Sequence, residues 1–144
     1  MSIKQISVFM ENKPGTLEEM TDVLAKNNID MRAISVAEAE DFGIARLIVD
    51  DVYETATVLK DAGFVNKLSE VLAVEIPDIP GGLNKVLKTL SAAQVNLEYM
   101  YAFLGGKDVD KAFLIMKVAH IDRAESTLKI GGFNLVDQEH ISEL

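Results

Sequence analysis

The chain carries the same proline-glycine segment twice. Residues 10–17 read MENKPGTL and residues 76–83 read IPDIPGGL, so Pro14 and Pro80 lie 66 positions apart (80 − 14). Further pairs at this spacing are Val8 with Val74, Leu17 with Leu83 and Leu24 with Leu90. A fixed spacing of this kind indicates an internal duplication. A chain of 144 residues then has room for two very small domains, which we expect at residues 1–70 and 71–144.

The spacing grows toward the C-terminus. We align Ala45 with Ala112 at a spacing of 67, and Gly63 with Gly132 at a spacing of 69. Insertions of one and two residues in connecting loops would produce this drift.

Each copy shows the same order of hydrophobic patterns. Alternation at Ile6, Val8 and Met10 predicts a strand, and apolar residues after Leu17 recur at helical spacing. The first copy continues with predicted strands at 31–39 and 44–49, a helix between Asp51 and Gly63, and a strand at 65–69. In the second copy we predict strands at 71–76, 97–104, 112–118 and 134–138, and helices at 83–93 and 122–130.

Each half therefore has the order βαββαβ. Right-handed crossovers turn this order into a four-stranded antiparallel sheet with two helices on one face, the ferredoxin-like arrangement. The predicted fold class is α+β with two such repeats.

Composition excludes several classes of function. A formal charge of −9 disfavours nucleic acid, because binding to phosphates needs clustered Lys and Arg. There is no cysteine, and the only histidines, His120 and His140, lack metal-ligand spacing, so we expect no metal, no cofactor and no catalytic residue. No apolar run is long enough to span a membrane, and no secretory signal pattern is present, so we expect a cytoplasmic protein without a membrane partner.

The repeated turn has the chemistry of an anion site. A strand-to-helix turn leaves the first N–H groups of the helix unpaired. Pro14 and Pro80 restrict the backbone, while Gly15 and Gly81 let another molecule approach it closely. The alternative is a purely structural turn preserved by shared descent.

Amides and carboxylates are exchanged between the copies. Asn12 corresponds to Asp78 before the turn, and Asp30 corresponds to Asn96 where the second strand begins. We expect the helix to return the chain to the neighbourhood of the turn. N–H donors, a carboxylate and an amide together suit a zwitterion, although Asn and Asp also form Asx turns and helix caps.

The βαββαβ order, with Asn12-Lys-Pro-Gly-Thr-Leu17 and Asp78-Ile-Pro-Gly-Gly-Leu83 at the turns, resembles the ACT domain in two tandem copies that cover nearly the whole chain. The resemblance implies a regulatory module that binds an amino acid where two such domains meet, with a regulated enzyme as a further partner. The implied ligand contacts are Asn12, Pro14, Gly15, Thr16, Leu17 and Asp30 in the first copy, and Asp78, Pro80, Gly81, Gly82, Leu83 and Asn96 in the second.

The two turns are predicted to differ in strength. Thr16 and Glu19 have capping-box spacing and would occupy N–H groups that a ligand needs, and Glu18 adds a second negative charge. The second copy has Asn84 and Lys85 instead of the two acids. We therefore expect the second turn to be the stronger carboxylate anchor.

Tyr99, Tyr101 and Phe103 alternate along one predicted strand whose intervening residues are also apolar. A strand that is apolar on both faces is usually covered on both. We expect a sheet-to-sheet contact with the other half or with a second chain, which favours a homodimer. The alternatives are half-exposed tyrosines or aromatic walls beside a ligand.

The sequence thus predicts a non-enzymatic regulatory protein that senses a free amino acid. Two alternatives stay open. Acyl-phosphate hydrolysis would use a cation at the turn, for which Lys13 is available in one copy. A pure interaction module would use the aromatic face and leave the turns inert.

Overall fold

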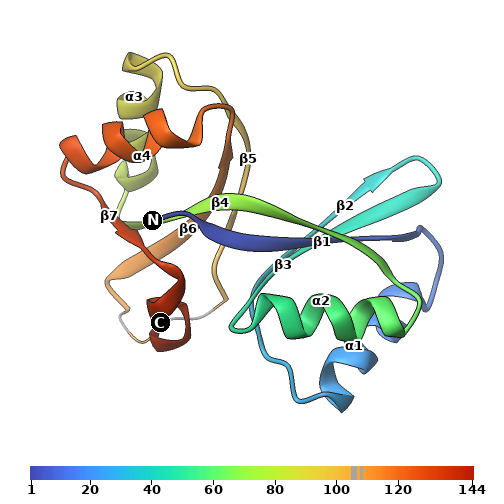
Figure 1. The fold of residues 1–144 in the computed structure, drawn as a ribbon. Helices are drawn as coiled ribbons and strands as arrows, with labels where there is room; N and C mark the ends of the chain where they lie inside the picture. Colours follow the sequence, from blue (N-terminus) through green and yellow to red (C-terminus); the bar gives the residue numbers. More distant parts are fainter. Residues whose placement is uncertain (105–106, 108) are drawn as a thin grey trace. The chain divides into compact units, whose positions relative to one another are not determined.

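Helices and strands follow the predicted order in both halves of the chain (Figure 1). The computed structural model describes residues 1–104, 107 and 109–144. Its elements are β1 (Ile3–Glu11), α1 (Thr16–Lys26), β2 (Met31–Ala39), β3 (Phe42–Val49), α2 (Val52–Asp61), β4 (Val65–Pro77), α3 (Gly82–Ala92), β5 (Leu97–Ala102), β6 (Lys111–Val118), α4 (Ile121–Ile130), β7 (Asn134–Val136) and a 3-10 helix (Gln138–Glu143). They form two units, residues 4–69 and residues 1–3 with 70–144.

Both units contain the predicted antiparallel sheet. In the first unit β3 lies between β2 and β1, and β4, whose first residues belong to this unit, follows β1 in the strand order. In the second unit β6 lies between β5 and β4, and β7 pairs with β4. The order is the same in both, which confirms two ferredoxin-like repeats.

The core of the first unit lies between its helices and one face of its sheet. Ile6 and Val8 alternate along β1, so both side chains point to the same face. The other members of this buried cluster are Met20 and Leu24 from α1, Ala45, Leu47 and Val49 from β3, and Val52 and Leu59 from α2. Because both helices contribute to one cluster, they cover the same face of the sheet.

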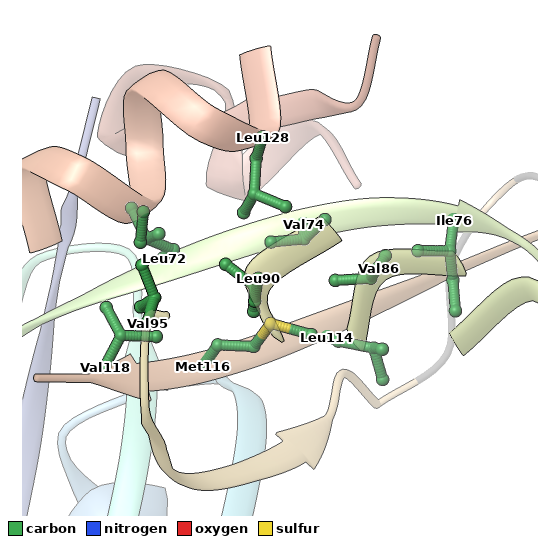
Figure 2. Close-up of a cluster of buried hydrophobic side chains, with 11 residues drawn as sticks. Leu72, Val74, Ile76, Val86, Leu90, Val95, Leu114, Met116, Val118 and Leu128 are labelled. Carbon is green, nitrogen blue, oxygen red and sulfur yellow. The ribbon is translucent and has the colours of Figure 1, made fainter. Parts of the chain in front are cut away.

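The second unit repeats this core. Figure 2 shows Leu72, Val74 and Ile76 of β4 packed with Val86 and Leu90 of α3. The cluster also contains Val95, Leu114, Met116 and Val118, together with Ala124 and Leu128 from α4. Fully burying a side chain such as Leu90 contributes about 1.5–3 kcal/mol, so these alternating positions supply much of the unit's stability.

Strand pairing corrects the predicted alignment of the third strand of each repeat. Val8 pairs with Ala45, and its counterpart Val74 pairs with Leu114. Ala45 therefore corresponds to Leu114 at a spacing of 69 (114 − 45), and its alignment with Ala112 was wrong. All three additional residues lie between β5 and β6.

Local signals at the second helix are confirmed. The Asp51 side chain caps α2 by accepting the Glu54 N–H at 3.0 Å. Gly63 follows the helix with a φ of +91°, and the Phe64 N–H donates to the Leu59 carbonyl at 2.9 Å, which is a Schellman motif.

Several predicted boundaries differ: β3 begins at Phe42 and not at residue 44, and β5 ends at Ala102 and not at residue 104. The strands predicted at 65–69 and 71–76 form one continuous strand, β4, because no Gly or Pro interrupts the chain between them. The last predicted strand, 134–138, ends at Val136, since the Asp137 side chain accepts the His140 N–H and begins the 3-10 helix. None of the helices in the described chain is long and apolar enough to cross a membrane.

Candidate functional site

Both Pro-Gly segments form the same backbone turn. The Thr16 N–H donates to the Lys13 carbonyl at 3.4 Å, and the equivalent bond from Gly82 to Ile79 is 3.0 Å. Gly15 has φ +90° and ψ −17°, and Gly81 has φ +88° and ψ −5°. Proline followed by a glycine with these angles defines a type II β-turn, in which the third residue must adopt a positive φ. The glycines therefore have a conformational role whether or not a ligand binds.

Each turn leads directly into a helix and leaves donors unpaired. The carbonyls of Gly15 and Gly81 accept the first helical bonds, from Glu19 at 3.0 Å and Lys85 at 3.1 Å. Within the described parts of the chain, three N–H groups at each turn have no acceptor: those of Gly15, Leu17 and Glu18 at the first turn, and of Gly81, Leu83 and Asn84 at the second. Such N–H groups at a helix start are suited to an anion.

The predicted capping box at the first turn is wrong. Helix α1 begins at Thr16 and is capped by Gly15, without a side-chain hydrogen bond. Thr16 thus lies one residue too far into the helix for its side chain to act as the N-cap, and its buried Oγ1 has no hydrogen-bond partner in the part of the chain that the structure describes. Self-capping therefore does not distinguish the turns.

Charge does distinguish them. Glu18 and Glu19 lie in the first turn of α1, whereas the first turn of α3 has no acidic residue. The Lys13 ammonium, at the first turn, lies 2.9 Å from a Glu11 carboxylate oxygen, and the hydrogen bond to Glu11 raises the pKa of Lys13 above its ordinary value.

The two turns also differ in how closely the first residue of the helix packs against the preceding strand. Gly82 is buried, and a Cβ at this position would lie only 2.4 Å from the Pro77 carbonyl oxygen. Its counterpart Thr16 carries a full side chain. Close approach of the backbone thus explains Gly82 without a ligand.

The residues before the turns join them to the neighbouring hairpins. The Asn12 N–H donates to the Asp41 carbonyl at 3.1 Å, and the Asp78 N–H donates to the Asp110 carbonyl at 2.9 Å. The Asn12 amide also donates to a Glu38 carboxylate oxygen at 3.2 Å. Pro14, Pro80 and Asp78 are exposed, as are Asn12 and Leu17, while Leu83 is half-buried.

Asp30 and Asn96 do not lie beside the turns of their own units. Asp30 precedes Met31, which pairs with Val49, whereas Glu11 before the turn pairs with Phe42. These ends of β3 are seven residues apart, which is about 23 Å. The Oδ2 atom of Asp30 instead lies 3.8 Å from Nη1 of Arg32.

The second copy has the same arrangement, since Leu97 pairs with Val118 and Pro77 with Lys111. Because each helix runs back along the sheet, the following strand begins at the opposite end. The expectation that the helix brings these residues to the turn was wrong.

The aromatic row along β5 and the residue that follows it is partly buried. Tyr99, Tyr101 and Phe103 are each half-exposed, and the Phe103 and Phe113 rings meet edge to face with centroids 6.3 Å apart. Met100, between the tyrosines, packs against the helix-facing core of the second unit.

A polar cluster in the second unit was not predicted. Glu75 accepts a hydrogen bond from the Asn134 amide at 2.8 Å and forms an ion pair with the Lys111 ammonium at 3.2 Å. In the sequence, Glu75 stands out only as a single acid among the apolar residues of β4. Asn134 and Lys111 are 59 and 36 residues away along the chain, so no local pattern connects them with Glu75. Among the described residues, no three or more His, Cys, Asp or Glu side chains lie together in a group that could hold a metal ion.

Comparison with known proteins places this geometry in a family. The family model of the ACT domain pair matches residues 1–144. No curated protein matches the sequence.

Solved structures share the fold. The crystal structure of protein BT0572 from Bacteroides thetaiotaomicron is 39% identical, with a TM-score of 0.92 over 100% of this chain and 98% of that one. The ligand-free regulatory subunit of aspartate kinase from Thermus thermophilus is 17% identical, with a TM-score of 0.66 over 88% of each chain. The corresponding subunit from Thermus flavus is 16% identical, with a TM-score of 0.63 over 90% of each chain. The resemblance drawn from the sequence is confirmed, and the chain belongs to the ACT domain pair family.

Proposed function

We propose that this chain is a non-enzymatic regulatory protein of the cytoplasm that binds a free amino acid at its Pro-Gly turns. The second turn is the stronger site in this proposal. Its N–H groups at Gly81, Leu83 and Asn84 bind the α-carboxylate, and the exposed Asp78 carboxylate before the turn accepts the ammonium. Asp30 and Asn96 have no part in a site formed within one unit.

One observation carries the proposal. At the second turn, three N–H groups have no acceptor among the described residues, and the first turn of the following helix has no acid and includes Lys85. A carboxylate there would meet donors and a cation, with no carboxylate on that helical turn to repel it. The first turn presents the same donors beside Glu18 and Glu19, so its ligand is bound more weakly.

Family and fold support a regulatory role. The solved structures of similar fold include two regulatory subunits of aspartate kinase. We propose an enzyme as the regulated partner and a homodimer as the active form, with the half-exposed Tyr99 and Tyr101 at the contact between the two copies. Light scattering should give twice the mass of one chain, and a monomer at micromolar concentration would contradict the dimer.

The hydrolase alternative has no comparable support. Lys13 is the cation that it would use, but the second turn, which has the more favourable charge, has Ile79 at the equivalent position. No observation on the described chain favours it.

A thermal-shift screen against the common amino acids tests the function. A ligand at 100 times its dissociation constant stabilises the folded chain by about 2.7 kcal/mol, which is a clear rise in Tm. We expect one amino acid, or a few similar ones, to raise Tm. No shift with any amino acid would contradict the proposal and favour a ligand-free interaction module.

A further inference from the structure

The second unit contains a cavity of about 370 Å³ beside the end of β4. Strand β7 pairs with β4 only up to Glu75, whereas β4 continues to Pro77. The last two residues of β4 therefore extend beyond the start of β7 and border the cavity. Ile76, Pro77 and Phe133 form its apolar wall, and Figure 2 shows Ile76 at one end of the core cluster.

A fixed ion pair forms the polar wall. The Lys111 ammonium lies 3.2 Å from Glu75 Oε1, and the Asn134 amide donates to Glu75 Oε2 at 2.8 Å. The Glu75 side chain is only 19% exposed. Because both of its oxygens are held, Glu75 fixes the position of Lys111 at the cavity.

Lys85 and Asp110 complete the charged lining. Two lysines and two acids give the lining a formal charge of zero, which disfavours a ligand with several negative charges. Two ammonium groups beside an apolar wall instead suit one carboxylate attached to an apolar body. The volume is within the range of small-molecule pockets.

The polar wall is specific to the second unit. At the spacings set by strand pairing, Glu75 corresponds to Phe9 and Lys111 to Phe42. The alignment of Gly63 with Gly132 makes Asn134 correspond to Val65. Shared descent of the two copies therefore does not account for these three polar side chains.

We propose that this cavity binds a small organic monocarboxylate with an apolar body. Lys111 and Lys85 bind the carboxylate, while Ile76, Pro77 and Phe133 contact the body. The lining does not include residues 78–84, so the cavity differs from the Pro-Gly turn, although Lys85 of the first turn of α3 borders both sites.

Nuclear magnetic resonance on the full chain tests this site. Two probes, 3-phenylpropanoate and 4-methylpentanoate, would be titrated while the backbone amides of Gly132 and Gly81 report on the cavity and on the turn. The uncharged 3-phenylpropan-1-ol controls for apolar contact alone. Lys111→Gln removes a cation of the cavity, and the matched Lys117→Gln removes the other ion-paired lysine of β6, which lies 3.1 Å from Glu98 and outside the cavity.

We expect a saturable shift at Gly132 with at least one carboxylate and none with the alcohol. Lys111→Gln should weaken binding about tenfold, with less than about a twofold effect from Lys117→Gln. If Lys111→Gln fails to fold, Lys85→Gln should weaken the binding that the Gly132 amide reports, relative to Lys88→Gln.

Equal effects of Lys111→Gln and Lys117→Gln on binding, or no saturable shift at Gly132, would overturn the cavity site. Shifts confined to Gly81 would also overturn it and would leave the proposal for the turn intact. Binding at Gly132 while no amino acid affects Gly81 would support the cavity and contradict the proposed function.

Discussion

The two Pro-Gly turns share one backbone and differ in charge. Gly15 and Gly81 have φ values of +90° and +88°, and at each turn the same three N–H positions have no acceptor within the described chain. Glu18 and Glu19 follow the first turn, whereas Asn84 and Lys85 follow the second. The backbone provides the donors in both copies, so the neighbouring side chains decide which turn accepts an anion.

The turns also differ in how tightly they pack. Gly82 lies against the Pro77 carbonyl, and no side chain fits there without movement of the backbone. At Thr16 a side chain is accommodated, although its hydroxyl has no hydrogen-bond partner among residues 1–104, 107 and 109–144. The second turn is thus held more closely to its strand, and a preformed set of donors loses less conformational freedom on binding.

The largest expected effect tests this packing difference. Gly82→Val should destabilise the chain by about 3 kcal/mol, because its side chain would overlap the Pro77 carbonyl. Thr16→Val should change stability by less than about 1 kcal/mol, since it removes an unpaired hydroxyl with little change of shape. Urea unfolding measures both variants, and equal losses would show that the turns pack alike.

The next effect concerns charge. Asn84→Glu places at the second turn the acid that the first turn has at Glu18, and it should weaken amino-acid binding by about 0.7–2.8 kcal/mol before salt screening, for a charge about 6 Å away. Glu18→Asn is the reciprocal variant and should not weaken binding at the second turn. Calorimetry checks both, and an unchanged affinity for Asn84→Glu would remove charge as the distinguishing feature.

Replacing the turn glycines should have similar effects in both copies. Gly15→Ala and Gly81→Ala should each cost about 1–2 kcal/mol, because both positions require a positive φ although a Cβ would meet no atom within 4 Å. Urea midpoints would report the loss. A cost at only one glycine would show that the two backbones are not equivalent.

The smallest effect concerns the 3-10 helix after β7, a feature of the second unit. Hydrogen bonding to Asp137 raises the pKa of the exposed His140, and hydrogen bonding to His140 lowers the pKa of Asp137. The stabilisation from His140 is fully present below the ordinary pKa of histidine and is lost as the pH rises through the raised value. The stabilisation from Asp137 is present above the ordinary pKa of Asp and is lost as the pH falls through the lowered value.

Urea midpoints measured against pH should therefore show a small advantage of the native chain over His140→Gln at pH 6. The advantage should disappear at high pH. If the stability advantage of the native chain over His140→Gln grew with pH, the raised pKa of His140 would be contradicted.

Sequence reasoning succeeded where the signal is local. Alternation and helical spacing gave the order of elements, and Asp51 and Gly63 marked the two ends of α2 because caps depend on neighbouring residues. The same reasoning placed both Pro-Gly turns before a helix.

It failed where distant residues decide. The shared alanine suggested that Ala45 aligns with Ala112, but apolar strands tolerate several alignments and only pairing with β1 and β4 selects one. Asp30 lies away from the turn because α1 runs back along the sheet, so that β2 begins at the opposite end of the sheet. The Glu75 cluster joins three strands, so no short motif could reveal it.

The central claim is that the second turn is the stronger anchor for the carboxylate of an amino acid. Its most direct test is to follow the backbone amide resonances of Gly81 and Gly15 during titration with the amino acid that raises Tm most. We predict that the Gly81 amide shifts and saturates first, while Gly15 shifts only at higher concentration or not at all. Saturation at Gly15 before Gly81, or no shift at either glycine, would contradict the claim.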